Sequence, residues 1–377
     1  MATSGNRLHR LNEPLTPTIV SLYEAVGDSA RWPAVLEQLS NRFSGRGAVL
    51  FALDPRDGTS AFSSIAQLDV QYLDLYNRHY VQRDPRIPRA LALPVCTPVT
   101  DAMVVEPGEY ERSEFYCDFL RPQGLRHVLG SILAHEPGLL SGFGIQRGRT
   151  QTSFDATDRA VLGEITPHLQ RALRLHLKLG ELAADRDILL GLLEQMTFGV
   201  VLLGAAGQVL HLNTRAQDIV ALRDGLAIER GELVPARSGD AATLRRLIQS
   251  SVGTWRGGSP GGLLRLARPS ARRPFQVLVT PFPRPGSSAI RAAAFLTDPE
   301  ARHQVSASLL RQSHGLTVAE AKLAARLAAG ETLAAAAGAL RVTDNTARTQ
   351  LKKIFEKTGT SRQSDFLRLV YSGPLQI

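Results

Sequence analysis

The segment 344–357 carries polar and basic side chains at the spacing of one helix face. Residues three and four apart lie on the same side of an α-helix. This face would hold Asn345, Arg348, Thr349 and Lys352, flanked by Lys353 and Lys357. The opposite face would hold Ala347, Leu351 and Ile354. Because an α-helix fits the major groove of B-DNA, where such groups reach base edges and phosphates, the spacing indicates DNA binding. A helical bundle with a basic outer face is the alternative.

Further helices surround this segment. The apolar periodicity predicts helices at 316–328, 333–339, 344–357 and 361–370. The link Leu340-Arg341-Val342 is so short that the second and third helices must cross steeply. We therefore expect an all-α four-helix unit at 303–377, with 10 basic and 5 acidic residues and a net charge of +5. Residues 1–186 hold 20 basic and 21 acidic residues. A basic excess at one end suits a polyanionic partner, although an Arg-rich composition alone would give the same count.

This C-terminal unit resembles the LuxR-type helix-turn-helix domain of bacterial transcription regulators. The matching positions are Leu316-Thr317-xx-Glu320, Gly330, Ala334–Ala337, Leu340-x-Val342, Asn345-Thr346-Ala347-Arg348, Ile354, Lys357-x-Gly359 and Arg362. The resemblance implies that 344–357 is the recognition helix. It implies phosphate contacts for Thr346 and Lys357, and base or phosphate contacts for Arg348, Thr349 and Lys352. Ala347, Gln350 and Thr358 depart from the residues usual in the family, which leaves the target sequence open.

The rest of the chain alternates helices and strands. Residues 1–186 are expected to contain a helical opening at 17–44, strands at 48–54, 128–135 and 141–147, helices at 68–80 and 110–120, and a long helix at 154–182. Residues 187–302 are expected to contain strands at 199–203, 209–213, 263–268, 275–281 and 292–297, with helices at 215–220 and 241–251. This order predicts an α+β fold class, with two α+β domains ahead of the helical unit.

The 187–302 segment resembles a PAS domain. Residues 199–222, GVVLLGAAGQVLHLNTRAQDIVAL, have the strand, glycine turn, strand and Asn-x-x-Ala order of that fold, and Asn213 would cap the following helix. PAS domains often hold haem or flavin, but this segment has no cysteine for a flavin adduct and only one histidine, His211. A lone histidine on a strand is typical of a surface or core position, so no cofactor is expected.

The 1–186 segment looks GAF-like, similar to the sensory halves attached to LuxR-type domains. Within it, Tyr72, Tyr76, Tyr80 and Asp84-Pro85 resemble the Tyr…Asp-Pro signature of acyl-homoserine-lactone receptors. That resemblance implies a pocket in which these rings and the carboxylate bind an amphipathic small-molecule signal. The tryptophans typical of those pockets are missing. A tyrosine stripe at helical spacing is also typical of a core.

Several classes of function lack their motifs. Two cysteines, Cys96 and Cys117, form no disulfide framework, and no Cys/His spacing suits a metal. No nucleotide loop, HExxH, nucleophile elbow or kinase signature appears, so no catalytic residue and no enzyme activity are expected. The N-terminus lacks the apolar run of a secretory signal and no run is long enough to span a membrane. We expect a cytoplasmic protein with no membrane partner.

Together these features predict a transcriptional regulator that binds double-stranded DNA as a homodimer and responds to a signal sensed by its N-terminal domains. The apolar stripe of the long helix would contribute to a parallel dimer, with Leu162, Ile165, Leu169, Ala172 and Leu179; packing on its own domain is the alternative. A ligand-binding adaptor or signalling protein whose helical tail binds a protein partner is the competing hypothesis.

Overall fold

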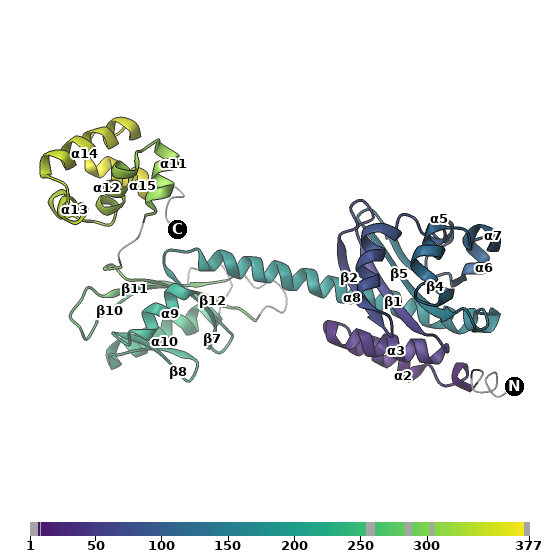
Figure 1. The fold of residues 1–377 in the computed structure, drawn as a ribbon. Coiled ribbons are helices and arrows are strands. Elements are labelled where there is room, and N and C mark those ends of the chain that lie inside the picture. Colours follow the sequence, from purple (N-terminus) through teal and green to yellow (C-terminus); the bar gives the residue numbers. More distant parts are fainter. Residues whose placement is uncertain (1–6, 8, 254–260, 283–288, 302–304, 373–377) are drawn as a thin grey trace. The chain divides into compact units, whose positions relative to one another are not determined.

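The computed structural model describes residues 7, 9–253, 261–282, 289–301 and 305–372. The chain divides into two compact units, Met1–Asp185 and Arg186–Ile377. Figure 1 shows strands and helices mixed in the first unit, and a second sheet followed by a group of helices in the second. The α+β class predicted from the sequence agrees with these elements. The predicted division of the second unit at 302/303 stays a prediction.

A five-stranded antiparallel sheet forms the centre of the first unit, in the order β2-β1-β5-β4-β3. Its strands are β1 (Gly47–Leu53), β2 (Ser60–Ala66), β3 (Val99–Thr100), β4 (Leu125–Glu136) and β5 (Leu139–Gly148). The sequence analysis placed β1, β4 and β5 but not β2 or β3. Side chains alternate between the two faces of a strand, so Leu50, Leu129 and Ile145 enter one core while Val49, Val128 and Gly144 face the other way.

Three long helices cover the first of these faces: α2 (Thr16–Glu24), α3 (Trp32–Arg42) and α8 (Ala156–Glu194). Short helical segments cover the second face: α4 (Val70–Leu75), the π-helical turn η2 (Tyr76–Tyr80), α5 (Arg86–Leu91), α6 (Asp101–Val104) and the π-helical turn η3 (Phe115–Leu120). The predicted helix at 110–120 is interrupted before η3. There Ser113 accepts a hydrogen bond from the Tyr116 amide, and such side-chain bonds compete with helical ones.

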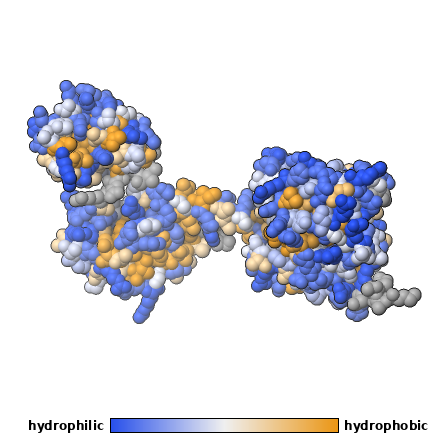
Figure 2. Space-filling model, viewed as in Figure 1, coloured by the Kyte–Doolittle hydropathy of each residue, from blue (hydrophilic) through white to orange (hydrophobic). Residues whose placement is uncertain are grey.

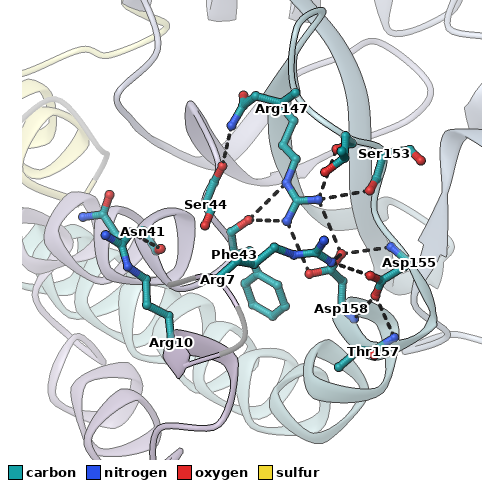
Figure 3. A network of polar contacts seen from close by, with 12 residues as sticks. Arg7, Arg10, Asn41, Phe43, Ser44, Arg147, Ser153, Asp155, Thr157 and Asp158 are labelled. Atoms are coloured by element: carbon teal, nitrogen blue, oxygen red, sulfur yellow. Dashed lines mark hydrogen bonds and ion pairs between the residues drawn. The ribbon is translucent and has the colours of Figure 1, made fainter. Parts of the chain in front are cut away.

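Arg147, at the end of β5, fastens the sheet to the start of α8 (Figure 3). Its Nε and Nη2 donate to the Phe43 carbonyl oxygen at 3.1 and 2.6 Å, and its Nη2 lies 3.3 Å from Asp158 Oδ1. The guanidinium also lies 3.8 Å from the centroid of the Phe154 ring. Its side chain is only 1% exposed, so the charge is buried with its partners supplied by the chain.

The packing of helix α8 contradicts the prediction that its apolar stripe contributes to a dimer. Leu162, Ile165, Leu169 and Ala172 are fully buried in the first unit's own core. These four residues therefore pack within their own chain, which was the alternative to a dimer contact. Leu179 is different, because it is 47% exposed. The helix also runs to Glu194, beyond the predicted end at 182; residues 181–194 contain no proline, and Gly191 lies within the helix without ending it.

The second unit begins with another antiparallel sheet, in the order β10-β11-β12-β6-β7. Its strands are β6 (Gly199–Leu203), β7 (Val209–Leu212), β10 (Gly262–Leu266), β11 (Phe275–Pro281) and β12 (Ala292–Thr297), packed with helices α9 (Thr214–Ala221) and α10 (Ser238–Gly253). Asn213 caps α9 as predicted, accepting from the Ala216 amide at 3.0 Å. A short hairpin of β8 (Leu226–Glu229) and β9 (Glu232–Pro235) was not predicted.

The C-terminal segment is helical, as predicted, but its described part, 305–372, contains one more helix than the four expected. Its helices are α11 (Ala307–His314), α12 (Val318–Ala328), α13 (Leu333–Leu340), α14 (Asp344–Thr358) and α15 (Gln363–Ser372). The extra helix α11 buries Leu310 in the same small core as Leu323, Leu327 and Phe366. This helix has only one turn of apolar residues, so its sequence shows too little helical periodicity to predict it.

Candidate nucleic-acid interface and ligand cavity

Helices α13 and α14 are joined by a tight turn. Helix α13 ends at Leu340, and Arg341 adopts the left-handed conformation with φ 56°. Thr343 then caps α14, because its hydroxyl accepts from the Thr346 amide at 3.2 Å. Three residues, 341–343, therefore join the two helices, one residue later than the predicted link 340–342; the steep crossing of the helices stays a prediction.

The inner face of α14 is the predicted one. Ala347 and Ile354 are fully buried and Leu351 is half-buried, all in the core that contains Leu327 and Ala336. This packing fixes the rotation of the helix about its axis. The residues predicted to contact DNA must therefore lie on the outer side.

The outer face of α14 is polar, basic and open. Its exposed residues include Asn345, Thr346, Arg348, Thr349, Lys352 and Lys353, and the helix also exposes Asp344, Glu356 and Lys357. Within the described part of the chain, Arg348, Lys352 and Lys353 form no ion pair with any acid. The Thr349 hydroxyl donates to the Asn345 carbonyl oxygen at 2.9 Å, so it is already engaged in its own helix. The three cations form a charged surface with no internal partner.

Lys357 differs from this group because the chain itself engages it. Its Nζ lies 2.7 Å from Oε2 of Glu320, which is 5% exposed and belongs to the capping box of α12. Burial alone would raise the pKa of Glu320, but hydrogen bonds from Lys357 and Thr317 hold that pKa below its usual value. Lys357 therefore ties the end of α14 to the start of α12, a role that sequence reasoning missed.

The first unit contains a cavity of about 130 Å³ on the sheet face opposite its main core. Since one water needs about 10–15 Å³ of such volume, the cavity has room for on the order of ten water-sized groups. Its walls are mostly apolar, and three of the four predicted ligand residues line it: Tyr72, Tyr76 and Asp84. Tyr80 does not; it is 7% exposed and packs against Phe115 and Phe119 in a neighbouring aromatic cluster.

Glycines line this cavity where it meets the sheet. Gly130 on β4 pairs with Gly144 on β5, and Gly142 lies on the same face as Gly144. A Cβ added to Gly144 would lie 3.5–3.7 Å from Val128, Gln146 and Val49, which all line the cavity. The space above Gly144 is therefore open because that position has no side chain, whereas a Cβ at Gly130 or Gly142 would lie within 2.6–2.7 Å of Phe143 or Phe51.

The carboxylate of Asp84 is saturated by donors from the chain. Oδ1 accepts from the backbone amide of Arg86 at 3.0 Å and from its Nε at 2.8 Å. Oδ2 accepts from Arg86 Nη2 at 2.7 Å and from the Tyr76 hydroxyl at 3.2 Å. A carboxylate has about four acceptor positions, so none is left for a ligand. Burial, together with the charge of Asp84, holds the pKa of Tyr76 well above its usual value, so Tyr76 remains a donor.

Arg86 is one of the cavity residues that the sequence analysis did not name. Its Nη1 is buried and has no hydrogen-bond partner, while its guanidinium carbon lies 4.7 Å from the Phe115 ring centroid. The signal for it was its position two residues after Asp84, with proline between them.

Two features, a metal-binding cluster and a membrane-spanning helix, are absent from the described residues. No group of three or more His, Cys, Asp or Glu side chains there could hold a metal ion. No helix in that part of the chain has both the length and the apolar character needed to cross a membrane.

Comparison with known proteins gives the following findings. No protein-family model matches the chain, and no curated protein matches it. Among solved structures, it is similar to the VqsR LBD domain from Pseudomonas aeruginosa, with 11% identity, TM-score 0.36, and coverage of 44% of this chain and 96% of that one. It is similar to CepR2 from Burkholderia cenocepacia, described as an N-acylhomoserine-lactone-dependent LuxR-family transcription factor, with 17% identity, TM-score 0.34, and coverage of 45% and 95%. SdiA from Escherichia coli has 10% identity, TM-score 0.32, and coverage of 96% and 97%. TM-scores this low do not show a shared fold.

Proposed function

We propose that this chain is a transcriptional regulator that binds double-stranded DNA through α14, as a homodimer in the cytoplasm, under the control of a small molecule held in the N-terminal cavity. We propose no enzyme activity for the chain and no cofactor for its middle domain. The observation that carries the proposal is the outer face of α14, where Arg348, Lys352 and Lys353 are exposed and pair with no acidic residue in the part of the chain that the structure describes.

The geometry of α13 and α14 supports this reading of the basic face. A short helix, a tight turn and a second helix whose rotation is fixed by Ala347 and Ile354 form the arrangement in which a recognition helix enters the major groove. Lysine and arginine neutralise phosphates and release counterions, which supplies most non-specific affinity. Arginine can also contact guanine through two hydrogen bonds, which supplies specificity.

A dimer is proposed because one small helical domain buries too little surface to hold DNA tightly, whereas two recognition helices can meet half-sites one helical turn apart. The buried stripe of α8 does not provide the contact. The rest of that helix exposes apolar side chains over several turns: Leu175, Leu179, Leu182, Ile188, Leu189 and Leu192. Figure 2 shows hydrophobic residues at the surface of this part of α8. A second copy of the same helix would cover them.

Ligand control follows from the cavity in the first unit. A molecule that binds one arrangement of a protein more tightly than another shifts the population toward it. A mostly apolar cavity with a few convergent polar groups is the common form of a small-molecule site. The ligand would thus change the fraction of protein competent to bind DNA.

The competing function is an adaptor whose helical tail binds a protein. The two are separated by fluorescence anisotropy of the full chain on a labelled random-sequence duplex across a range of salt concentrations. The logarithm of the association constant should fall with the logarithm of salt, with a slope of about −0.9 for each neutralised phosphate. No binding at low salt, or binding that salt does not weaken, would favour the adaptor.

A further inference from the structure

We propose that His176 is a proton-sensitive latch. Its neutral ring holds α8 on the core of the first unit at the point where the helix leaves that core, and protonation in mild acid releases the helix there. This role goes beyond the proposed function, since its trigger is a proton and neither DNA nor a small molecule. It depends on where His176 lies in α8 and on the hydrogen bonds of its ring.

His176 is the last buried residue of α8. Leu169 and Leu173 precede it in the core of the first unit, and its own side chain is 9% exposed. Beyond it, every residue of the helix up to Glu194 is half-buried or exposed. The contacts of this one side chain therefore mark the point at which α8 separates from the core.

The Nδ1 atom of His176 accepts two hydrogen bonds. The backbone N–H of Gly27 donates to it at 3.1 Å, and the indole Nε1–H of Trp32 donates to it at 3.3 Å. Both groups can only donate, so Nδ1 must be unprotonated while they hold it. In a neutral ring the proton then lies on Nε2, from which Ser29 Oγ accepts at 3.2 Å. All three partners belong to the segment 27–32, so the neutral ring joins α8 to that segment.

Protonation of Nδ1 is incompatible with these contacts. The added N–H would point at the N–H groups of Gly27 and Trp32, and both would lose their acceptor. Trp32 is fully buried, so water does not replace the lost partner, and an unsatisfied buried donor is costly. The ring of Phe62 lies 4.8 Å from that of His176 between centroids, and apolar surroundings disfavour a charge. The cationic ring is therefore stable only if it leaves this site.

Few charged groups face the ring. On the segment before α3, Asp28 is the acid that acts on it, and Asp28 already pairs with Arg31 at 3.3 Å. Strand β2 contributes Phe62 and helix α3 contributes Trp32, neither of which is charged. The positions one turn away on α8 are also uncharged: Ala172, Leu173, Leu179 and Gly180. No strong ion pair therefore holds the ring in its cationic form.

The balance of these groups sets the direction of the response. Burial lowers the pKa of His176 below its usual 6.5, and it outweighs the Ala25 carbonyl and Asp28, which favour the charged form. For a histidine whose pKa is lower in the folded chain, the stabilising contribution is complete above pH 6.5 and is lost as the pH falls through the folded pKa. The latch is thus closed at neutral pH and opens in acid.

Trp32 fluorescence reports the state of the His176 ring. The two ring centroids are 5.7 Å apart, and an imidazolium quenches a neighbouring indole more strongly than a neutral imidazole does. The change Trp255→Phe leaves Trp32 as the single tryptophan of the full chain. Lowering the pH from about 8 to about 5 should change its emission in one transition centred below pH 6.5, ahead of the unfolding followed by circular dichroism. No transition before unfolding would overturn the proposal.

Two variants assign the transition. In His176→Gln the side-chain amide can still accept and donate but does not titrate, so the transition should vanish. His168→Gln is the matched control, because His168 lies on the same helix and its Nδ1 is 3.3 Å from the Tyr23 hydroxyl, which can donate or accept. This control should keep the transition. A transition that survives in His176→Gln, or that disappears in both variants, would rule out His176.

Release of the helix is measured by amide hydrogen exchange of the segment 175–185, relative to the segment 162–172 in the same sample. This ratio cancels the pH dependence of the exchange chemistry. From about pH 8 to about pH 5 it should rise about fivefold or more in the native chain, as expected for the loss of one hydrogen bond, and stay constant in His176→Gln. A constant ratio in the native chain would overturn the latch, whether or not His176→Gln folds.

Neither measurement uses DNA or a small molecule. If the chain binds no DNA and His176 behaves as described, the proposed function fails and the latch stands. If DNA binding is found and the emission of Trp32 does not titrate, the latch fails alone.

Discussion

Basic side chains of the first unit and of helix α14 lie in contrasting settings. Arg147 is 1% exposed, pairs with Asp158 and donates to the Phe43 carbonyl, so the chain supplies its acceptors. Arg348 and Lys352 are exposed and have no acidic partner in the described residues. Arg86 stands between the two: its Nε and Nη2 are paired with Asp84, and its buried Nη1 has no hydrogen-bond partner among the described residues.

The contrast separates structural from functional cations. A buried charge without partners costs several kcal/mol, so a cation like Arg147 is retained only with partners built around it. An exposed cation costs little to leave unpaired, and it remains available to an anion from outside. Burial and pairing, not residue type, thus distinguish a cation that holds the fold from one that binds DNA.

The largest effect is expected where a paired cation is removed. Arg147→Met should destabilise the first unit by about 3 kcal/mol, because the buried Asp158 loses one of its two arginine partners and the Phe43 carbonyl loses both of its guanidinium donors; Arg7 still pairs with Asp158. Thermal unfolding of the full chain measures this. Arg149→Met, two residues away at an exposed position, is the matched control and should change stability by less than about 0.5 kcal/mol. Equal losses of stability in the two variants would contradict the distinction between buried, paired cations and exposed ones.

Removing an unpaired cation should leave stability alone and change recognition. Arg348→Ala should weaken binding to the preferred DNA site by about 1–3 kcal/mol more than binding to random DNA, because a contact with guanine is lost. Anisotropy on both duplexes gives the two affinities. If their ratio stays the same, Arg348 does not read bases, and Asn345 and Thr349 are the next candidates.

Lys357 sharpens the comparison, because it lies on α14 yet is paired. Lys357→Ala should cost about 1 kcal/mol of stability, less than a fully buried pair because its side chain is 34% exposed. Lys352→Ala, which breaks no pair, should cost stability nothing measurable. A helical segment equally stable in both variants by thermal unfolding would show that the Glu320 contact contributes little.

The smallest effect concerns Asp224, in the sheet-containing part of the second unit, which pairs with the buried Arg268. Hydrogen bonds from Ser270, joined by Arg268, lower the pKa of Asp224 from 3.8 to about 2. Its stabilising contribution is thus complete above pH 4 and is lost as the pH falls toward 2. Asp224→Asn should flatten the acid limb of the unfolding curve in that window. An unchanged limb would remove Asp224 from the acid response.

Long, strongly periodic elements could be predicted from the sequence, and short ones could not. The bounds predicted for β6, β11 and β12 agree with the structure to the residue, since each is an apolar run between turn residues. Strand β2, SAFSSIA, has only two large apolar residues, and each strand of the β8–β9 hairpin has four residues. These strands form because they are hydrogen-bonded to adjacent strands, and the local sequence pattern does not show which segments will be adjacent.

The candidate sites divide in the same way. The inner and outer faces of α14 follow from helical spacing alone, so they could be predicted. The cavity depends on glycines that meet across β4 and β5, and the partner of Lys357 lies 37 residues away at Glu320. The stripe of α8 had the right periodicity, but periodicity does not say whether a partner lies in the same domain or in a second copy.

The central claim is that the unpaired cations of α14 bind DNA, and a pair of charge-matched variants tests it most directly. One variant changes Arg348, Lys352 and Lys353 to glutamine. The other changes three exposed arginines of the middle domain in the same way: Arg215, Arg245 and Arg246. Affinity for a random duplex is measured by anisotropy across salt concentrations for both. The α14 variant should bind more weakly and its salt slope should shrink by about 0.9 for each lost phosphate contact, while the control keeps the native slope. Native affinity and slope in the α14 variant, or an equal loss in both, would contradict the account.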